Sequence, residues 1–519
     1  MATLGRSKRL DFWLPWRSPV SRRPRCLPTL LLAAALLAGC SPPYDAAAGG
    51  PNTLRVAVSA DAGESLNPYV GTQSPIQELR SSLLFEGLTA LDPEGKAEWR
   101  LATGMTSNAD RTQWTITLRP GVKFTDGTEF TSADVVSSIK YLRDPAHAAQ
   151  GLALIQMIDP GSVRAVDKLT VRVGLTEPFS PFKEIWASVL LPMTKTGSAP
   201  AKPIGTGPFA VKSFVPGRES TVERFDGYWG EKPKLSAVQL IEYQSQQAQA
   251  NALLSGRVDI ASNTSPTIAK SLVGRDGIQL LDSKGNFSLR IGLNTAVPPF
   301  SDVRVRQALR LLVDRQQIVS NVFSGYARIA NDYETTAPPC AAPDITQRAP
   351  DVAAAKRLLA EAGQTDLAFA ITTDGLLPGM SELAQVFAQN AAQAGVKVSV
   401  NVVPTPELLA KWGKWPAYVD YNPVPYLPSV LGSLLPDRIG NGANWNDPAF
   451  VKLAGKLFSS PEKDQCPLMN RMHEIEYTSG PNITPAFSDV LMPHRPAVRG
   501  LVPDVNGRPL SFLTGVTVG

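Results

Sequence analysis

The sequence has 519 residues, 43% of them hydrophobic, and a formal net charge of +5 at pH 7. The first 39 residues hold seven Lys and Arg against one Asp, so removing this +6 leaves the rest of the chain at −1. Without a basic surplus the chain lacks the usual means of holding phosphates, and we expect no nucleic-acid partner. A remainder of this length exceeds what one hydrophobic core usually organises, which predicts two or three lobes.

The first 40 residues have the order of a secretory signal, because basic residues precede an apolar run at 27–38. That run has 12 residues, whereas about 20 helical residues are needed to cross a bilayer, so a permanent transmembrane helix is not expected. The run ends in Leu37-Ala38-Gly39-Cys40, which resembles the bacterial lipobox. We therefore predict a signal peptide over 1–39, acylation of Cys40 and a location on the extracytoplasmic face of the cell membrane. The alternative to acylation is that Cys40 is a free cysteine at the end of an apolar stretch. Residues 40–50 predict a flexible tether.

Four cysteines occur, and Cys26 and Cys40 belong to the predicted signal and anchor. The two that remain, Cys340 and Cys466, predict a disulfide because exported proteins fold in oxidising compartments. Two buried, unpaired thiols are the alternative. The three histidines are scattered along the chain, so we expect no metal site and no cofactor.

The part after the tether begins with strand-like and helix-like segments. Residues 54–58 predict a strand, and 61–68 form a loop of turn-forming residues. An apolar stretch at 79–88 predicts a helix, and alternating residues at 114–118 predict one strand of a hairpin or meander. Thr131 can form a capping box that opens a further helix.

The later part repeats a β-α-β order. Asp351 can cap a helix that ends at Gly363, and strand-like residues follow at 367–373. A helix-like segment at 381–394 leads to an alternating strand at 396–400. This order predicts an α/β fold with a sheet covered by helices.

The chain resembles the bacterial extracellular solute-binding family 5, which includes dipeptide-, oligopeptide- and nickel-binding proteins. The motifs that carry the resemblance lie at 66–69, 84–88, 114–127, 205–209, 294–295, 302–309 and 355–363. Each motif can be explained by structure alone: some residues form turns, some glycines permit tight backbone conformations, and the helical leucines fill a hydrophobic core. We expect these motifs to identify the fold without forming the site.

The resemblance implies a periplasmic-binding-protein-like fold (type II, cluster C) with two hinged lobes around the ligand and an extra subdomain in lobe I. Transferred to this chain, the boundaries are 51–78, 200–295 and 487–519 for lobe I, 79–199 for its subdomain and 296–486 for lobe II. Such lobes close by hinge motion. The implied function is capture of a peptide or peptide-like molecule for an ABC importer, with its permease subunits as partners and the chain as a monomer.

In peptide-binding members, a tryptophan and an aspartate late in lobe II help to close the pocket and neutralise the peptide's α-amino group. The corresponding segment here is 412–427, where Asp420 is the available acid but the usual W-x-x-D spacing is absent. The candidate ligand-binding residues are Asp420, Tyr421 and Tyr426 in this segment, and Ser65, Asn67 and Tyr69 after the first strand. Ordinary turns are the alternative for both segments.

An enzyme is the main rival from another class, because Ser137-Ser138-Ile139-Lys140 has the S-x-x-K spacing of serine acyl-transferases. Lys195-Thr196-Gly197 matches K-T-G, but the sequence has no S-D-N partner, G-x-S-x-G, Walker loop or H-E-x-x-H. We therefore expect no catalytic residues. A regulatory or scaffold lipoprotein with the same fold and no transport ligand is the other alternative.

Overall fold

The computed structural model describes residues 50–519 except 62, 71–73, 200–201, 276, 335–339, 341–343 and 423–424. The predicted signal peptide and the acylation site Cys40 lie outside the described residues. Within the described part, no helix has the length and apolar character needed to span a bilayer.

One large mixed sheet runs through the described part of the chain, in the order β15-β14-β16-β12-β17-β11-β1-β10-β9-β8, with β13 paired to β17. Its strands are β1 (Thr53–Ser59), β8 (Phe209–Val215), β9 (Glu219–Arg224), β10 (Ala237–Tyr243), β11 (Ile260–Ala261), β12 (Gln279–Leu293), β13 (Ala327–Ile329), β14 (Ala368–Thr373), β15 (Lys397–Val402), β16 (Ala417–Asn422) and β17 (Asn482–His494). The helices beside it are α1 (Pro75–Leu84), α4 (Gln246–Leu254), α5 (Pro266–Leu272), α6 (Val303–Leu311), α7 (Arg315–Asn321), α8 (Val352–Glu361), α9 (Met380–Ala392) and α10 (Thr405–Ala410).

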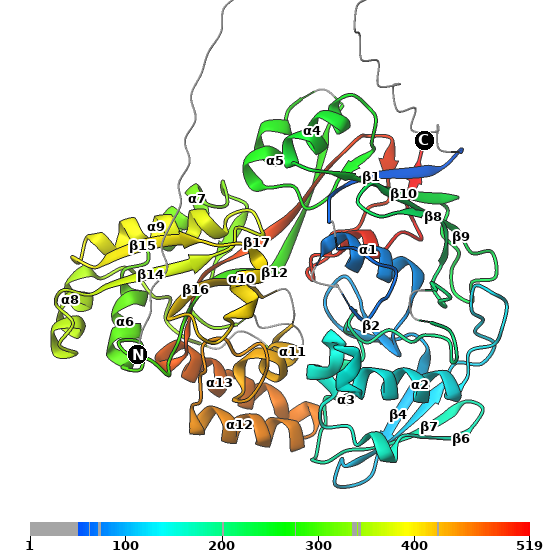
Figure 1. The fold of residues 1–519 in the computed structure, drawn as a ribbon, viewed down its shortest axis with the longest axis horizontal. Coiled ribbons are helices and arrows are strands. Elements are labelled where there is room, and N and C mark those ends of the chain that lie inside the picture. The colour runs from blue at the N-terminus through cyan, green and yellow to red at the C-terminus, as the bar shows by residue number, and fades with distance from the viewer. Residues whose placement is uncertain are drawn as a thin grey trace, which may run out of the picture. The chain divides into compact units, whose positions relative to one another are not determined.

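The long antiparallel pair β12 and β17 joins the two halves of this sheet (Figure 1). At one end β17 pairs with β11, where His494 lies opposite Ile260. At the other end β12 pairs with β16 over Ser288–Leu293. The register between β12 and β17 shifts between Ser283 and Phe287, so the pairing is interrupted between the two halves. An irregular ladder bends more easily than a regular one.

A second sheet has the order β4-β5-β7-β6 and is antiparallel throughout. Its strands are β4 (Ala102–Ser107), β5 (Gln113–Leu118), β6 (Arg164–Asp167) and β7 (Thr170–Gly174), and the short strands β2 (Thr89–Leu91) and β3 (Ala97–Trp99) precede it. The helix α2 (Ser132–Arg143) begins where the sequence predicts, because Asp134 Oδ2 accepts a 2.8 Å hydrogen bond from Thr131 N.

The predicted β-α-β segment is confirmed by α8, β14, α9 and β15. Asp351 Oδ1 accepts a 2.8 Å hydrogen bond from Ala354 N at the start of α8. Gly363, with φ +68°, follows the end of that helix in the left-handed conformation that glycine adopts without strain. The strands β14 and β15 are parallel, as a helical crossover requires. The mixed α/β class is therefore confirmed, whereas the lobe boundaries stay a prediction.

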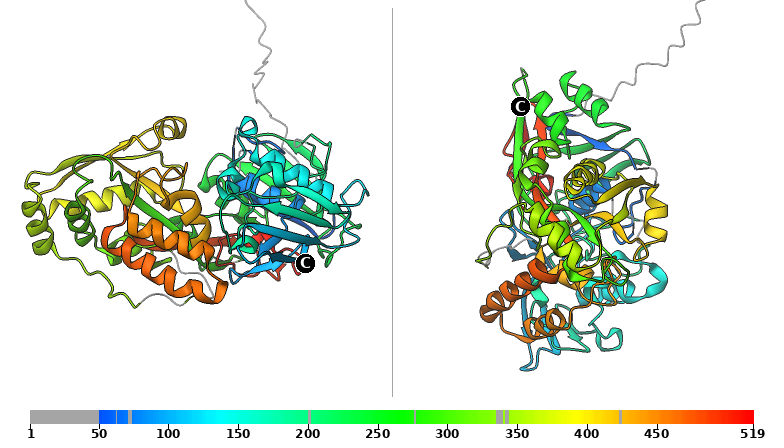
Figure 2. Two further views of the ribbon diagram at one scale, coloured as in Figure 1. Left: turned by 90° about the horizontal axis from the view of Figure 1, so that it is seen from below. Right: turned by 90° about the vertical axis from the view of Figure 1, so that its left-hand side faces the viewer.

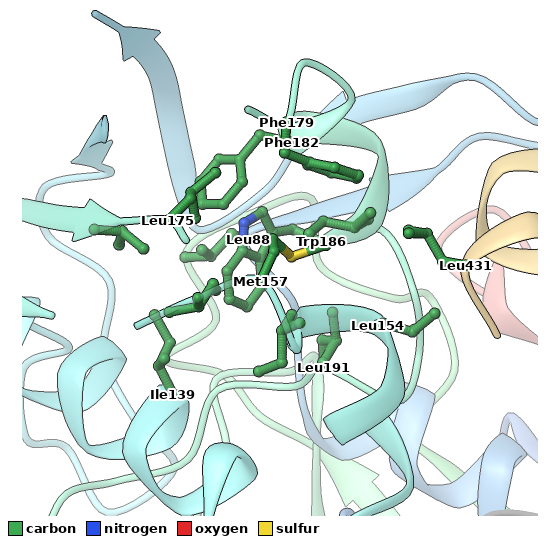
Figure 3. Close-up of a cluster of buried hydrophobic side chains, with 14 of the residues drawn as sticks. Leu88, Ile139, Leu154, Met157, Leu175, Phe179, Phe182, Trp186, Leu191 and Leu431 are labelled. Carbon is green, nitrogen blue, oxygen red and sulfur yellow. The ribbon is translucent and has the colours of Figure 1, made fainter. Parts of the chain in front are cut away.

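The largest hydrophobic cluster joins segments that are far apart in sequence. Leu88, Ile139 and Trp186 come from the region of the second sheet, and Leu431 reaches the same cluster from the short helical segment η4 (Val430–Leu434) (Figure 3). The cluster also takes in side chains of α12 (Pro448–Ser459) and α13 (Gln465–Ser479), which pack against each other (Figure 2). The short helices α3 (Phe182–Ile185) and α11 (Tyr426–Ser429) contact each other beside this cluster.

Candidate ligand-binding site

A cavity of about 800 Å³ lies between the segments that we assign to lobe I and those that we assign to lobe II. Its lining includes residues 59–61, 74–75, 77–78, 183–184 and 187–190 on one side, 425–428 and several residues of α13 on the other, and residues of the connecting strands β12 and β17. Ligand sites in proteins commonly have volumes of about 300–1,000 Å³. The cavity is therefore large enough for a small organic ligand.

The wall beside α1 carries both polar and charged groups. Gln77 Nε2 donates a 3.2 Å hydrogen bond to Asp61 Oδ2. Glu78 Oε1 lies 3.6 Å from Arg508 Nη1, and both residues line the cavity. Burial raises the pKa of Glu78, while the charge of Arg508 opposes that rise. This wall thus offers an acid and a base close together.

The opposite wall is one face of α13. Cys466, Met469 and His473 line the cavity and are spaced by three and four residues, which puts them on the same side of a helix. In the structure Cys466 forms a disulfide with Cys340, with the two sulfur atoms 2.14 Å apart. The disulfide ties this face of α13 to the segment that contains residue 340.

His473 is buried on this wall without a hydrogen-bond partner. His473 is 1% exposed, and neither its Nδ1 nor its Nε2 has a hydrogen-bond partner in the described part of the chain. The rings of Tyr426 and Tyr333 flank it, with centroids 4.1 Å and 5.1 Å from that of the imidazole. Burial lowers the pKa of His473 to about 3, so the imidazole is neutral at pH 7.

Tyr426 is held in place by a buried glutamate one helical turn beyond His473. Tyr426 Oη donates a 2.7 Å hydrogen bond to Glu476 Oε1, and Glu334 N donates a 3.1 Å hydrogen bond to Glu476 Oε2. Burial, together with the nearby Glu334 charge, raises the pKa of Glu476 to about 8. The tyrosine ring is therefore fixed against His473 by a hydrogen bond that does not depend on a ligand.

Comparison with known proteins identifies the family to which the chain belongs. Residues 96–431 match the model of the bacterial extracellular solute-binding proteins, family 5, in its middle region. The chain belongs to this family. Its relatives include the glutathione-binding protein GsiB of Salmonella paratyphi A, which is 29% identical over 349 residues, covering 65% of this chain and 67% of the relative. GsiB of Escherichia coli K12 is 28% identical over 387 residues, 73% of each chain.

Solved structures agree with this assignment at the level of the fold. The binding protein AgaA from A. tumefaciens R10, in complex with agropinic acid, has a TM-score of 0.79 at 23% identity and covers 90% of this chain and 99% of its own. DppA from Helicobacter pylori, in complex with the peptide STSA, has a TM-score of 0.78 at 21% identity and covers 90% and 98%. The predicted periplasmic-binding-protein-like fold is thereby confirmed.

Among the site residues predicted in the family's lobe II segment, Tyr421 and Tyr426 line the cavity. Asp420 is not among the lining residues. Successive residues of a strand point to opposite faces, so Asp420 and Tyr421 on β16 cannot both face the cavity. Asp420 Oδ2 instead lies 2.8 Å from Arg290 Nη2. A ligand amine would have to share that carboxylate with Arg290, and the role of Asp420 in ligand binding stays a prediction.

The three residues predicted after the first strand lie outside the lining of the cavity. Ser65 Oγ accepts a hydrogen bond from Asn67 N at 3.2 Å, and Asn67 Oδ1 accepts one from Tyr69 N at 3.0 Å. The Tyr69 ring is buried, and its hydroxyl donates to the Pro192 carbonyl at 3.0 Å. These are the contacts of a well-packed turn, and a role in ligand binding remains a prediction here as well.

Sequence reasoning missed the cavity face of α13 and the polar residues of α1. The signal that could have revealed the α13 face is the spacing of Cys466, Met469, His473 and Glu476 by three, four and three residues, which is typical of one side of a helix. The S-x-x-K segment lies on α2 outside the lining, and Ser138 Oγ accepts a 3.0 Å hydrogen bond from Thr194 N. Among the described residues, no group of three or more His, Cys, Asp or Glu is placed to hold a metal ion.

Proposed function

We propose that this chain is the ligand-capturing lipoprotein of an ABC importer and that it encloses a peptide or peptide-like molecule in the cavity described above. The cavity carries the proposal, because its walls come from both predicted lobes and combine aromatic rings with polar groups. Tyrosine rings bury apolar parts of a ligand, while a few polar groups fix its orientation.

The charges of the lining support a ligand with both an amine and a carboxylate. The described lining contains the acids Asp61, Glu78, Glu184, Glu462 and Asp489 and the bases Lys96, Lys183 and Arg508. Charge-assisted hydrogen bonds are stronger than neutral ones, so the acids and bases of the lining can hold the two ends of a zwitterion. The names of the relatives, which include glutathione and peptide binders, support the same class of ligand.

Contacts across the predicted lobes support enclosure by hinge closure. Ser180 N donates a 2.5 Å hydrogen bond to the Phe458 carbonyl, and the rings of Phe179 and Phe458 have centroids 5.2 Å apart. These contacts join the predicted subdomain to α12. A ligand that touches both walls would stabilise this arrangement over an open one, and permease subunits could then distinguish loaded from empty protein.

The proposal includes the membrane anchor. Acylation at Cys40 and the tether at 40–50 would hold the binding protein close to its permease on the extracytoplasmic side of the membrane.

Titration calorimetry with reduced glutathione and with the peptide STSA tests the function on the full chain. We expect one ligand per chain and an affinity that falls when Tyr421, in the cavity lining, is changed to alanine. Tyr141→Ala, on α2 outside the lining, is the matched control. Native mass spectrometry of the protein purified from its host complements the titration. A chain without bound mass that also gives no heat with either ligand would contradict transport and favour a regulatory or scaffold role.

A further inference from the structure

The unpartnered imidazole of His473 needs a hydrogen-bond partner. More than about nine in ten buried polar groups in folded proteins have one, because an unpaired group loses the bonds that water gave it. His473 is 1% exposed, lines the cavity, and has no partner in the described residues for either ring nitrogen. A group within the cavity is the available partner.

The surroundings of the ring keep it neutral and fix its direction. Tyr426 packs against it at 4.1 Å between centroids, and the buried acid one turn further along the helix, Glu476, already accepts hydrogen bonds from Tyr426 and from Glu334 N. Burial lowers the pKa of His473 to about 3. A neutral imidazole has one N–H donor and one acceptor nitrogen, so it can serve a partner that both accepts and donates.

A second unpaired atom lies on the opposite wall. Gln77 is buried and lines the cavity, and its Oε1 has no partner in the described part of the chain. Its Nε2 donates to Asp61 Oδ2, which fixes the orientation of the amide and leaves Oε1 as an acceptor. This acceptor suits an N–H group of a ligand.

We propose that His473 contacts the ligand as a neutral donor and acceptor for a backbone-type amide, and that Gln77 Oε1 accepts an N–H group from the same ligand. The inference rests on the proposed function and narrows its ligand class to molecules with internal amide groups. An amide supplies both the carbonyl that the imidazole N–H requires and the N–H that its other nitrogen requires. A carboxylate or an amine supplies only one of these.

Affinity is tested with two substitutions at the same position. His473→Phe keeps a planar ring and removes both nitrogens, whereas His473→Gln keeps a donor and an acceptor. We expect His473→Phe to bind the peptide STSA and reduced glutathione about 10-fold more weakly or worse, since a ligand amide is left unpaired, and His473→Gln to recover part of the loss. His147→Phe is the control, because His147 lies outside the cavity lining.

Nitrogen-15 NMR of histidine-labelled wild-type protein gives a readout that a merely structural role would not move. The chain has three histidines, so their ring resonances are assigned by single substitution. We expect peptide to shift both ring nitrogens of His473 and to leave those of His147 unchanged. If His473→Phe does not fold, this measurement on the wild type decides the question.

The outcomes separate the inference from the function on which it rests. Wild-type protein that binds peptide with no change at the His473 ring, or with full affinity in His473→Phe, overturns the inference alone. A His473 ring that responds to Ni²⁺ alone but not to either peptide overturns the assignment to an amide. Absence of any peptide binding by the wild type overturns both proposals.

Discussion

Arg290 and Asp420 lie opposite each other in the register of β12 and β16, and Arg290 Nη2 is 2.8 Å from Asp420 Oδ2. The same guanidinium also contacts Glu334 through Nη1. A single buried cation therefore links two strands of the sheet to the segment that precedes α8. This cluster has a structural role whether or not Asp420 also meets a ligand.

The first prediction concerns stability at this pair. Asp420→Asn should lower the free energy of unfolding by about 2 kcal/mol, because hydrogen bonds to charged groups contribute roughly 1.5–3 kcal/mol. Glu334 still pairs with Arg290 in the variant, so the guanidinium is not left alone. Urea denaturation measures the change, and an unaltered midpoint would contradict it.

The same variant tests the amine hypothesis separately. If Asp420 holds a cationic amine, its removal should cost about 2–5 kcal/mol of binding, on the order of 30-fold or more in affinity. Calorimetry on reduced glutathione and on the peptide STSA measures this, with Asp374→Asn as the comparison. Equal small effects from both variants would show that Asp420 does not bind the amine.

The Cys340–Cys466 disulfide closes a sequence separation of 126 residues. In the chain-entropy account, cross-linking a loop of this length restricts the unfolded chain by about 5 kcal/mol. Replacing both cysteines by alanine should therefore lower the unfolding free energy by an amount of that order. Two thiols that react with an alkylating reagent in native, exported protein would refute the bond.

Glu476 makes stability depend on pH. Its folded pKa of about 8 exceeds its ordinary value of 4.5, so between these values the folded chain holds a proton that the unfolded chain has released. Stability is therefore lost as the pH rises through this window. His473, whose pKa is lowered by burial to about 3, acts in the opposite direction below its ordinary value of 6.5.

Between pH 6.5 and pH 8 other groups also titrate, Glu242 with its pKa raised to about 7 among them, so the comparison of wild type with Glu476→Gln isolates the glutamate. We expect the unfolding free energy to fall over this interval in the wild type and to fall less in Glu476→Gln. Glu474→Gln, an exposed position on the same helix, is the control and should behave as the wild type does. Parallel curves for wild type and Glu476→Gln would contradict the raised pKa.

Phe458 connects α12 to the predicted subdomain. Phe458→Ala removes its ring contact with Phe179, and such pairs contribute about 0.5–1.5 kcal/mol beyond burial. Because this contact is made across the predicted lobes, its loss should weaken ligand binding about 2- to 10-fold and enlarge the radius of gyration in small-angle scattering. Leu409→Ala, at an exposed position on α10, should change neither.

The lipid anchor is tested at Cys40, which lies outside the described residues. Cys40→Ser should abolish acylation and move the protein out of the membrane fraction, because it removes the predicted site of the acyl chains that would anchor the protein. Membrane fractionation measures where the protein partitions, and intact-mass measurement shows whether Cys40 is acylated. A wild-type chain that is wholly soluble with an unmodified cysteine would refute the anchor.

Local patterns in the sequence were sufficient for most of the predicted elements and for the α/β class, although the helix predicted at 79–88 is found at Pro75–Leu84. The caps at Thr131 and Asp351, the glycine at 363 and the β-α-β order depend on neighbouring residues and on the spacing of apolar side chains. These interactions extend over a few residues, so the sequence alone determines them.

The site depended on contacts that no local pattern records. Asp420 is adjacent to Tyr421, yet only the pairing of β12 with β16 determines that Arg290 faces the acid while the tyrosine faces the cavity. His473 and Gln77 are almost four hundred residues apart, and each has ordinary helical neighbours in the sequence. Their shared cavity and their unpaired atoms arise only when α13 and α1 are brought to opposite walls, because burial and hydrogen-bond satisfaction are properties of the folded chain.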